Sequence, residues 1–77
     1  MIDNETRRKI EKHLGEECDV NEYFRECYRT EVDGESFIII APPKKQEGDC
    51  TVVFSEETGE FAGLERWSYA RKYGEKL

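Results

Sequence analysis

The chain is 77 residues long, 39 % of them charged and 36 % hydrophobic, and its formal net charge is −6. A chain of this length forms a single domain, 1–77, with a small core, because it buries only roughly 60 % of its unfolded surface. No apolar run approaches the ~20 residues that a membrane-spanning helix needs, and the first residues lack the pattern of a signal peptide, so we expect neither membrane insertion nor secretion.

The first predicted element is a helix over residues 3–14. Asp3 or Asn4 can cap its N-terminus, because a short polar side chain there accepts a hydrogen bond from the first turn. One face carries side chains at helical spacing. These are Ile2, Thr6, Ile10, His13 and Leu14. Gly15 follows directly, and we expect it to end the helix in the left-handed conformation.

Residues 20–26 fit two structures, a short helix and the extension of a strand. The segment from Asp19 to Glu22 has the residues of a capping box. The same segment is followed by Tyr, Phe and Cys, which are strand-forming residues. Residues 27–32 are predicted to be a strand in either case, because the turn that follows them needs a preceding strand.

Two turn sequences share one pattern, TEVDGE at 30–35 and SEETGE at 55–60. Each places a glycine where the backbone needs a positive φ, and Asp-Gly is among the strongest short signals for a β-hairpin. Pro42 and Pro43 end the most apolar strand and begin a loop over 42–49, because proline cannot donate to a ladder. The predicted strands are 27–32, 36–41, 50–54 and 61–64, the last reaching at most Trp67.

The last predicted element is a short helix from Trp67 to Gly74. Leu64, Trp67, Ala70 and Tyr73 recur every three residues along one side. The expected fold class is therefore α+β: an N-terminal helix, a four-stranded antiparallel β-meander made of two hairpins, and a short C-terminal helix. At least one helix should cover a face of the sheet.

The residues that could ligate a metal are His13, Cys18, Cys27 and Cys50. No two of them form the close pair that zinc sites usually contain, so we expect no metal site and no cofactor. The odd number of cysteines argues against a disulfide framework and favours a reducing cytoplasm. No nucleotide-binding fingerprint or nucleophilic arrangement is present, and we expect the protein not to be an enzyme.

Residues 16–35 hold eight acidic and two basic residues and carry the whole net charge of −6. Such a stretch is either a solvated face or a surface for a protein partner with a basic surface. The partner-binding residues that we predict are Glu22, Tyr23, Phe24, Glu26, Glu31 and Glu35. Repulsion from phosphate makes nucleic acid an unfavourable partner for this stretch. A homodimer stays open, because the basic residues near the chain ends complement the acidic stretch.

The segment Thr51–Phe61 resembles the strand, acidic Thr-Gly turn and strand of PepSY-type modules and some small immunity proteins. The resemblance covers about eleven residues and transfers no functional residue. We expect a small acidic protein that acts as a non-enzymatic protein-binding or inhibitory module, of the immunity, antitoxin or anti-defence kind found in microbes and phages. The alternative is a nucleic-acid-binding accessory protein that uses the basic and aromatic segment Arg66–Lys76.

Overall fold

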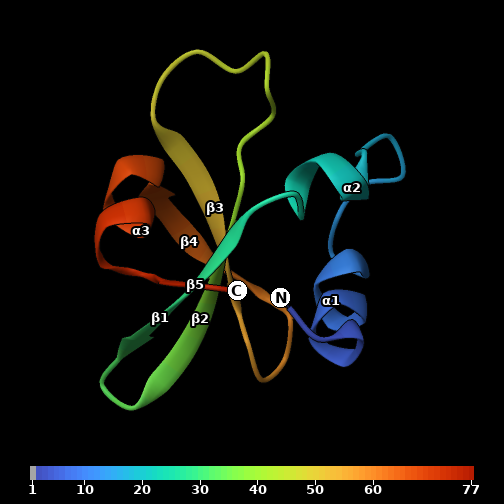
Figure 1. Cartoon of the computed structure of the whole chain (residues 1–77). Coiled ribbons are helices and arrows are strands. Elements are labelled where there is room, and N and C mark those ends of the chain that lie inside the picture. The colour runs from blue at the N-terminus through green and yellow to red at the C-terminus, as the bar shows by residue number, and fades with distance from the viewer. Residues whose placement is uncertain (1) are drawn as a thin grey trace.

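The computed structural model describes residues 2–77 and shows an α+β fold built on a five-stranded antiparallel sheet (Figure 1). The elements are α1 (Asn4–Glu11), α2 (Val20–Tyr23), β1 (Cys27–Val32), β2 (Glu35–Ile40), β3 (Cys50–Ser55), β4 (Phe61–Arg66), α3 (Trp67–Tyr73) and β5 (Glu75–Lys76). The strand order across the sheet is β4-β3-β2-β1-β5. None of the helices in residues 2–77 combines the length and the apolar character that crossing a membrane requires.

The predicted α+β class, the N-terminal helix and the C-terminal helix are confirmed, but the prediction of four strands was wrong. The fifth strand, β5, pairs with β1 through Tyr28↔Lys76 and Arg29↔Glu75. The Leu77 N–H extends this pairing by donating to the Cys27 carbonyl at 3.0 Å. α3 returns the chain to the open edge of β1, so tertiary structure and not local sequence makes this polar segment a strand.

The helix α1 begins where predicted and ends early. Asp3 is its N-cap, and its side chain accepts from the Thr6 N–H at 2.7 Å. The helix stops at Glu11, and Gly15 is not among the residues with positive φ, so the left-handed cap predicted there was wrong. The side chains of Thr6 and Ile10 are buried against the sheet.

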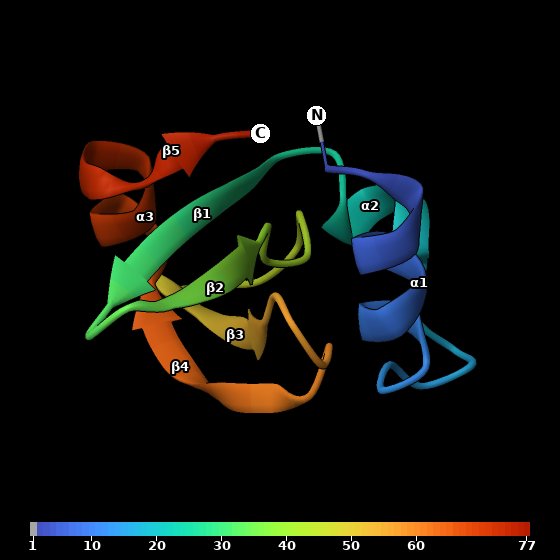
Figure 2. The same ribbon diagram turned by 90° about the horizontal axis from the view of Figure 1, so that it is seen from below.

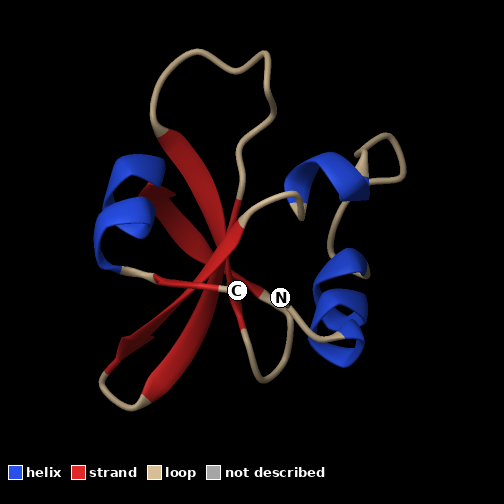
Figure 3. Cartoon of the chain, viewed as in Figure 1, coloured by secondary structure: helices blue, strands red, loops and turns tan. Residues whose placement is uncertain are grey.

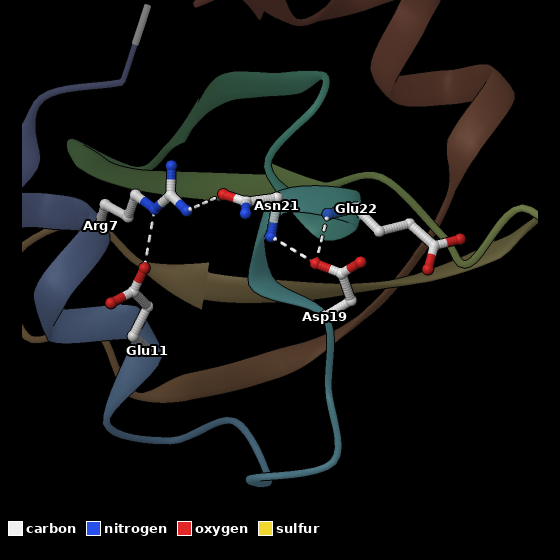
Figure 4. Close-up of polar contacts among 5 residues, drawn as sticks. All are labelled: Arg7, Glu11, Asp19, Asn21 and Glu22. Atoms are coloured by element: carbon white, nitrogen blue, oxygen red, sulfur yellow. Dashed lines mark hydrogen bonds and ion pairs between the residues drawn. The ribbon is translucent and has the colours of Figure 1, made fainter.

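Residues 20–23 form the short helix α2, so the helical alternative holds for the first part of 20–26. Asp19 caps it by accepting from the N–H groups of Asn21 and Glu22 at 3.0 and 3.3 Å (Figure 4). The reciprocal half of a capping box is missing, because the Glu22 carboxylate accepts from the Lys44 N–H at 2.6 Å instead. The chain then extends into β1 at Cys27.

The two similar turn sequences form different turns. Asp33 and Gly34 both have positive φ, 51° and 82°, and Val32 pairs with Glu35, which defines the tight two-residue hairpin that was predicted. The second turn is longer: the Ser55 N–H donates to the Glu60 carbonyl at 2.8 Å across it. It contains Gly59 at φ 77° and leads to a bulge in the β3–β4 pairing.

The sheet has a core on each face, because α1 and α2 lie on one side and α3 on the other (Figures 2 and 3). Ile38 and Ile40 of β2 face the first side and belong to the larger core. The members of that core are Ile10, Cys27, Ile38, Ile40 and Phe54. Ile39 faces the other side, where it packs with Tyr28 and Ala70. The continuous apolar run of β2 is thus buried on both faces, as its sequence predicts.

Candidate protein-binding surface

The six residues predicted to bind a partner do not form one surface. α2 and the turn between β1 and β2 lie at opposite ends of β1, so Glu22 is far from Glu31 and Glu35 (Figure 1). Tyr23 and Phe24 are half-buried and pack against the larger core. The six predicted residues therefore belong to one acidic stretch of the sequence but not to one surface of the structure.

Two of the predicted acids have internal structural partners. The Glu26 carboxylate accepts from the Tyr28 hydroxyl at 2.9 Å and lies 3.5 Å from Arg71 Nε, which links β1 to α3. Burial and the Glu26 carboxylate together raise the pKa of Tyr28 above its ordinary value. Glu22 binds the Lys44 N–H and so anchors the 42–49 loop. These carboxylates hold elements of the fold together.

Side-chain contacts hold α2 against α1 (Figure 4). Arg7 Nε donates to Glu11 at 2.7 Å, and Arg7 Nη2 donates to the Asn21 side-chain oxygen at 2.9 Å. The Arg7 guanidinium also stands 4.9 Å from the centre of the Phe24 ring, a cation–π geometry. The wall that α1 and α2 form beside the sheet is therefore fixed from several directions.

An apolar groove of about 650 Å³ lies between this wall and the β3–β4 hairpin. Its apolar lining is Leu14, Tyr23, Pro42, Pro43, Val52, Phe54, Phe61 and Leu64. Phe61 and Leu64 are 59 % and 65 % exposed, although both are large apolar side chains. Tyr23 is the one predicted site residue that lines the groove, and burial, followed by the neighbouring Cys18, raises its pKa.

An acidic hollow of about 540 Å³ lies at the turn end of the sheet. Four carboxylates from three separate segments line it, Glu5, Glu35, Glu56 and Glu57, together with a single cation, Lys9. The Glu56 carboxylate is bound by Arg29 through two contacts of 2.6 and 3.1 Å, which raises the pKa of that arginine. Within residues 2–77, Glu35 and Glu57 have no ion-pair partner. Glu35 is the predicted site residue found here.

The groove and the acidic hollow share no lining residue, but both border the turn between β3 and β4. Residues 55–58 of that turn line the hollow, and Phe54 and Phe61 on either side of it line the groove. Gly59 of that turn is buried directly against the backbone of Lys9. A Cβ at Gly59 would lie 2.5 Å from the Lys9 carbonyl oxygen, well inside van der Waals contact. Lys9 Nζ also donates to the Glu57 carbonyl at 2.9 Å. This close contact holds the β3–β4 turn, which borders both depressions, against α1.

The outer edge of β4 beside the groove is poorly suited to pairing with another strand. Gly63 has φ 143° and lies at the bulge, which interrupts the regular strand. The Glu65 carboxylate accepts from the Arg66 N–H at 2.8 Å. A bulge and charged side chains are common ways of protecting a strand edge, so this edge is poorly suited to extending the sheet with another strand.

Over residues 2–77, no three His, Cys, Asp or Glu side chains are placed to hold a metal ion. The three cysteines are free thiols, and burial raises the pKa of Cys27. The chain matches no protein-family model, no curated protein and no solved structure. The arrangement of surfaces within this chain is therefore the basis for a functional proposal.

Sequence reasoning did not identify the groove or the acidic hollow. The groove draws on the α1–α2 connection, the 42–49 loop and the β3–β4 hairpin, and the hollow on α1 and both turns. The only local signal was the pair Phe61 and Leu64, large apolar residues that flank Gly63 in a strand.

Proposed function

We propose that this protein is a non-enzymatic binding module that masks a surface of a basic protein partner, in the manner of an inhibitor or immunity protein. The observation that carries the proposal is the combination of an apolar groove and an acidic hollow that border the same turn between β3 and β4. A partner that fits both presents one or two apolar side chains followed by lysine or arginine. The free thiols are consistent with action in the cytoplasm.

Phe61 and Leu64 are suited to supply the affinity. Burying a side chain of this size contributes roughly 1.5–3 kcal/mol, and interface energy usually concentrates in a few such residues. Their exposure in the unbound chain leaves most of that area available.

The carboxylates of the hollow are suited to supply specificity and speed. Acidic groups that face a basic partner accelerate association, and salt weakens this attraction because it screens exposed charges. Glu35 and Glu57, which have no ion-pair partner among residues 2–77, are the residues expected to meet lysine or arginine of the partner.

The test is affinity capture from host lysate with four forms of the protein. Leu64→Ser removes an exposed groove side chain, Glu57→Gln removes a charge of the hollow, and Val32→Ser changes another exposed apolar residue, 55 % exposed, that does not line the groove. We expect the wild type and Val32→Ser to capture the same protein, and the other two to capture much less.

Salt provides a second criterion in the same experiment. Raising the salt concentration should reduce the amount of partner captured by a smaller factor for Glu57→Gln than for the wild type. The variant has lost one charge, so salt has less electrostatic attraction to screen. Equal capture by all four forms would overturn the proposed surface. Sedimentation of the purified chain separately tests whether the partner is a second copy.

One observation favours a second candidate function, binding of single-stranded nucleic acid by α3. Tyr69 and Tyr73 are exposed, their ring centres are 4.9 Å apart, and Lys72 Nζ lies 5.2 Å from the Tyr73 ring. Exposed aromatic rings beside cations can stack with bases. A filter-binding titration decides it: no binding at ~50 mM salt, where phosphate contacts are strong, rejects this function.

A further inference from the structure

Two of the three thiols open into the apolar groove. Cys18, in the connection between α1 and α2, and Cys50, the first residue of β3, both line it. Cys18 is half-buried and Cys50 is exposed, whereas Cys27 is buried in the larger core. The fold thus brings together two cysteines that are 32 positions apart in the sequence.

The groove around these thiols is concave and mostly apolar, and its polar lining is His13, Gln46, Glu47 and Thr51. Val52 and Leu64 are paired across β3 and β4 and share a face with Cys50, two residues away along the strand. On the α1–α2 side of the groove, Cys18 lines it together with Tyr23, whose pKa is raised by burial and then by Cys18. A neutral apolar molecule in this groove would therefore meet a thiol at either wall.

We propose that the groove binds small apolar electrophiles of the α,β-unsaturated carbonyl class and that Cys50 and Cys18 capture them covalently. In the reaction the thiol loses its proton to solvent and the sulfur bonds to the β-carbon. The π electron pair moves to the carbonyl oxygen, and water returns a proton to the α-carbon. No oxidant or reductant takes part. The site exists whether or not a protein partner uses the groove.

The experiment compares two neutral reagents on the intact protein, N-ethylmaleimide and N-cyclohexylmaleimide, each normalised to its rate with glutathione. Peptide mapping by mass spectrometry assigns the label to each cysteine. We expect Cys50 and Cys18 to favour the cyclohexyl reagent about tenfold, the ratio given by burying roughly 55 Å² of additional apolar surface. Cys27 should stay unlabelled until the protein unfolds.

Two surface variants test whether the preference comes from the groove. Leu64→Ser should lower the normalised preference several-fold at Cys50, and Val32→Ser should leave it unchanged. Both residues are exposed, so neither substitution removes a core side chain. Equal normalised rates for the two reagents, or a preference that Leu64→Ser does not alter, would overturn the proposal. Because the readout needs no protein partner, its result is independent of the proposed partner function.

Discussion

Replacing Gly59 with alanine should destabilise the protein far more than the same replacement at Gly34. Both glycines have left-handed backbones, with φ of 77° and 82°. They differ in their surroundings: a Cβ at Gly34 would meet no atom within 4 Å, whereas one at Gly59 would lie 2.5 Å from the carbonyl oxygen of Lys9 and 2.6 Å from its Cβ. The comparison therefore isolates the packing of the β3–β4 turn on α1.

Two contributions determine how much free energy of unfolding each glycine replacement removes. A left-handed backbone costs an alanine roughly 1–2 kcal/mol, partly offset by about 0.4–1 kcal/mol from the stiffer unfolded chain. This part is common to both positions and gives a net loss of about 1 kcal/mol. At Gly59 the turn must also move away from α1, and overpacking of this kind costs about 1–3 kcal/mol. The expected losses are thus ~1 kcal/mol for Gly34→Ala and ~3 kcal/mol for Gly59→Ala.

Thermal and urea unfolding measure these losses. For a domain of this size 1 kcal/mol lowers the Tm by roughly 4–8 °C, so the two variants should differ by at least about 8 °C. The dependence of the unfolding free energy on urea concentration should stay the same, because the folded state remains compact. Equal destabilisation of the two variants would refute the view that α1 and the turn are locked together at Gly59.

Three further predictions concern single groups in the core and at the first helix. Thr51 is buried and its hydroxyl donates to the Ile40 carbonyl, so Thr51→Val should lower the free energy of unfolding by about 1–2 kcal/mol in urea. No loss relative to the control Thr30→Val, whose half-buried side chain makes no hydrogen bond within residues 2–77, would contradict this. Hydrogen bonds from Thr6 lower the pKa of Asp3 below its ordinary value of 3.8 in the folded protein. The stability that Asp3 confers is therefore complete above the pKa of the unfolded chain, and it is lost as the pH falls through the lower pKa of the folded protein. Asp3→Asn keeps a capping acceptor, and its Tm should therefore fall less steeply than that of the wild type below pH 4; parallel Tm curves would reject this role. Cys27 should react with a thiol reagent only through unfolding, because burial raises the pKa of its thiol, and a native-state rate equal to that of Cys50 would show that the core is open.

The elements that the sequence predicted correctly are those whose signals are local. The Asp33-Gly34 turn needs only two residues able to adopt positive φ. The cap signal at Asp19 was also local, but the strand-forming residues after it left helix and strand both open. β5 could not be predicted in this way, because Glu75 and Lys76 become a strand only when α3 delivers them to the edge of β1. The contact between Gly59 and Lys9 could not be predicted for the same reason. The sequence indicated a turn at Gly59, but only the tertiary fold brings that turn against Lys9.

The candidate surface was less predictable than the fold, because acidic residues that are close together in the sequence do not have to lie on the same face of the folded protein. The acidic run at 16–35 is divided between α2, β1 and the first hairpin, where Glu22 and Glu26 bind other parts of the chain. The hollow instead collects Glu5 and Glu57, which lie outside that run. A partner-binding surface assembled from distant segments leaves no continuous pattern in the sequence.

The burial of β2 on both faces has a consequence for how the molecule unfolds. Ile38 and Ile40 complete one core and Ile39 completes the other, so neither helical layer can separate without exposing part of the same strand. The two layers should therefore be lost together as one cooperative unit. The backbone amides of these three isoleucines should then exchange with solvent deuterium only when the whole domain opens, and their exchange rates should report its global free energy of unfolding.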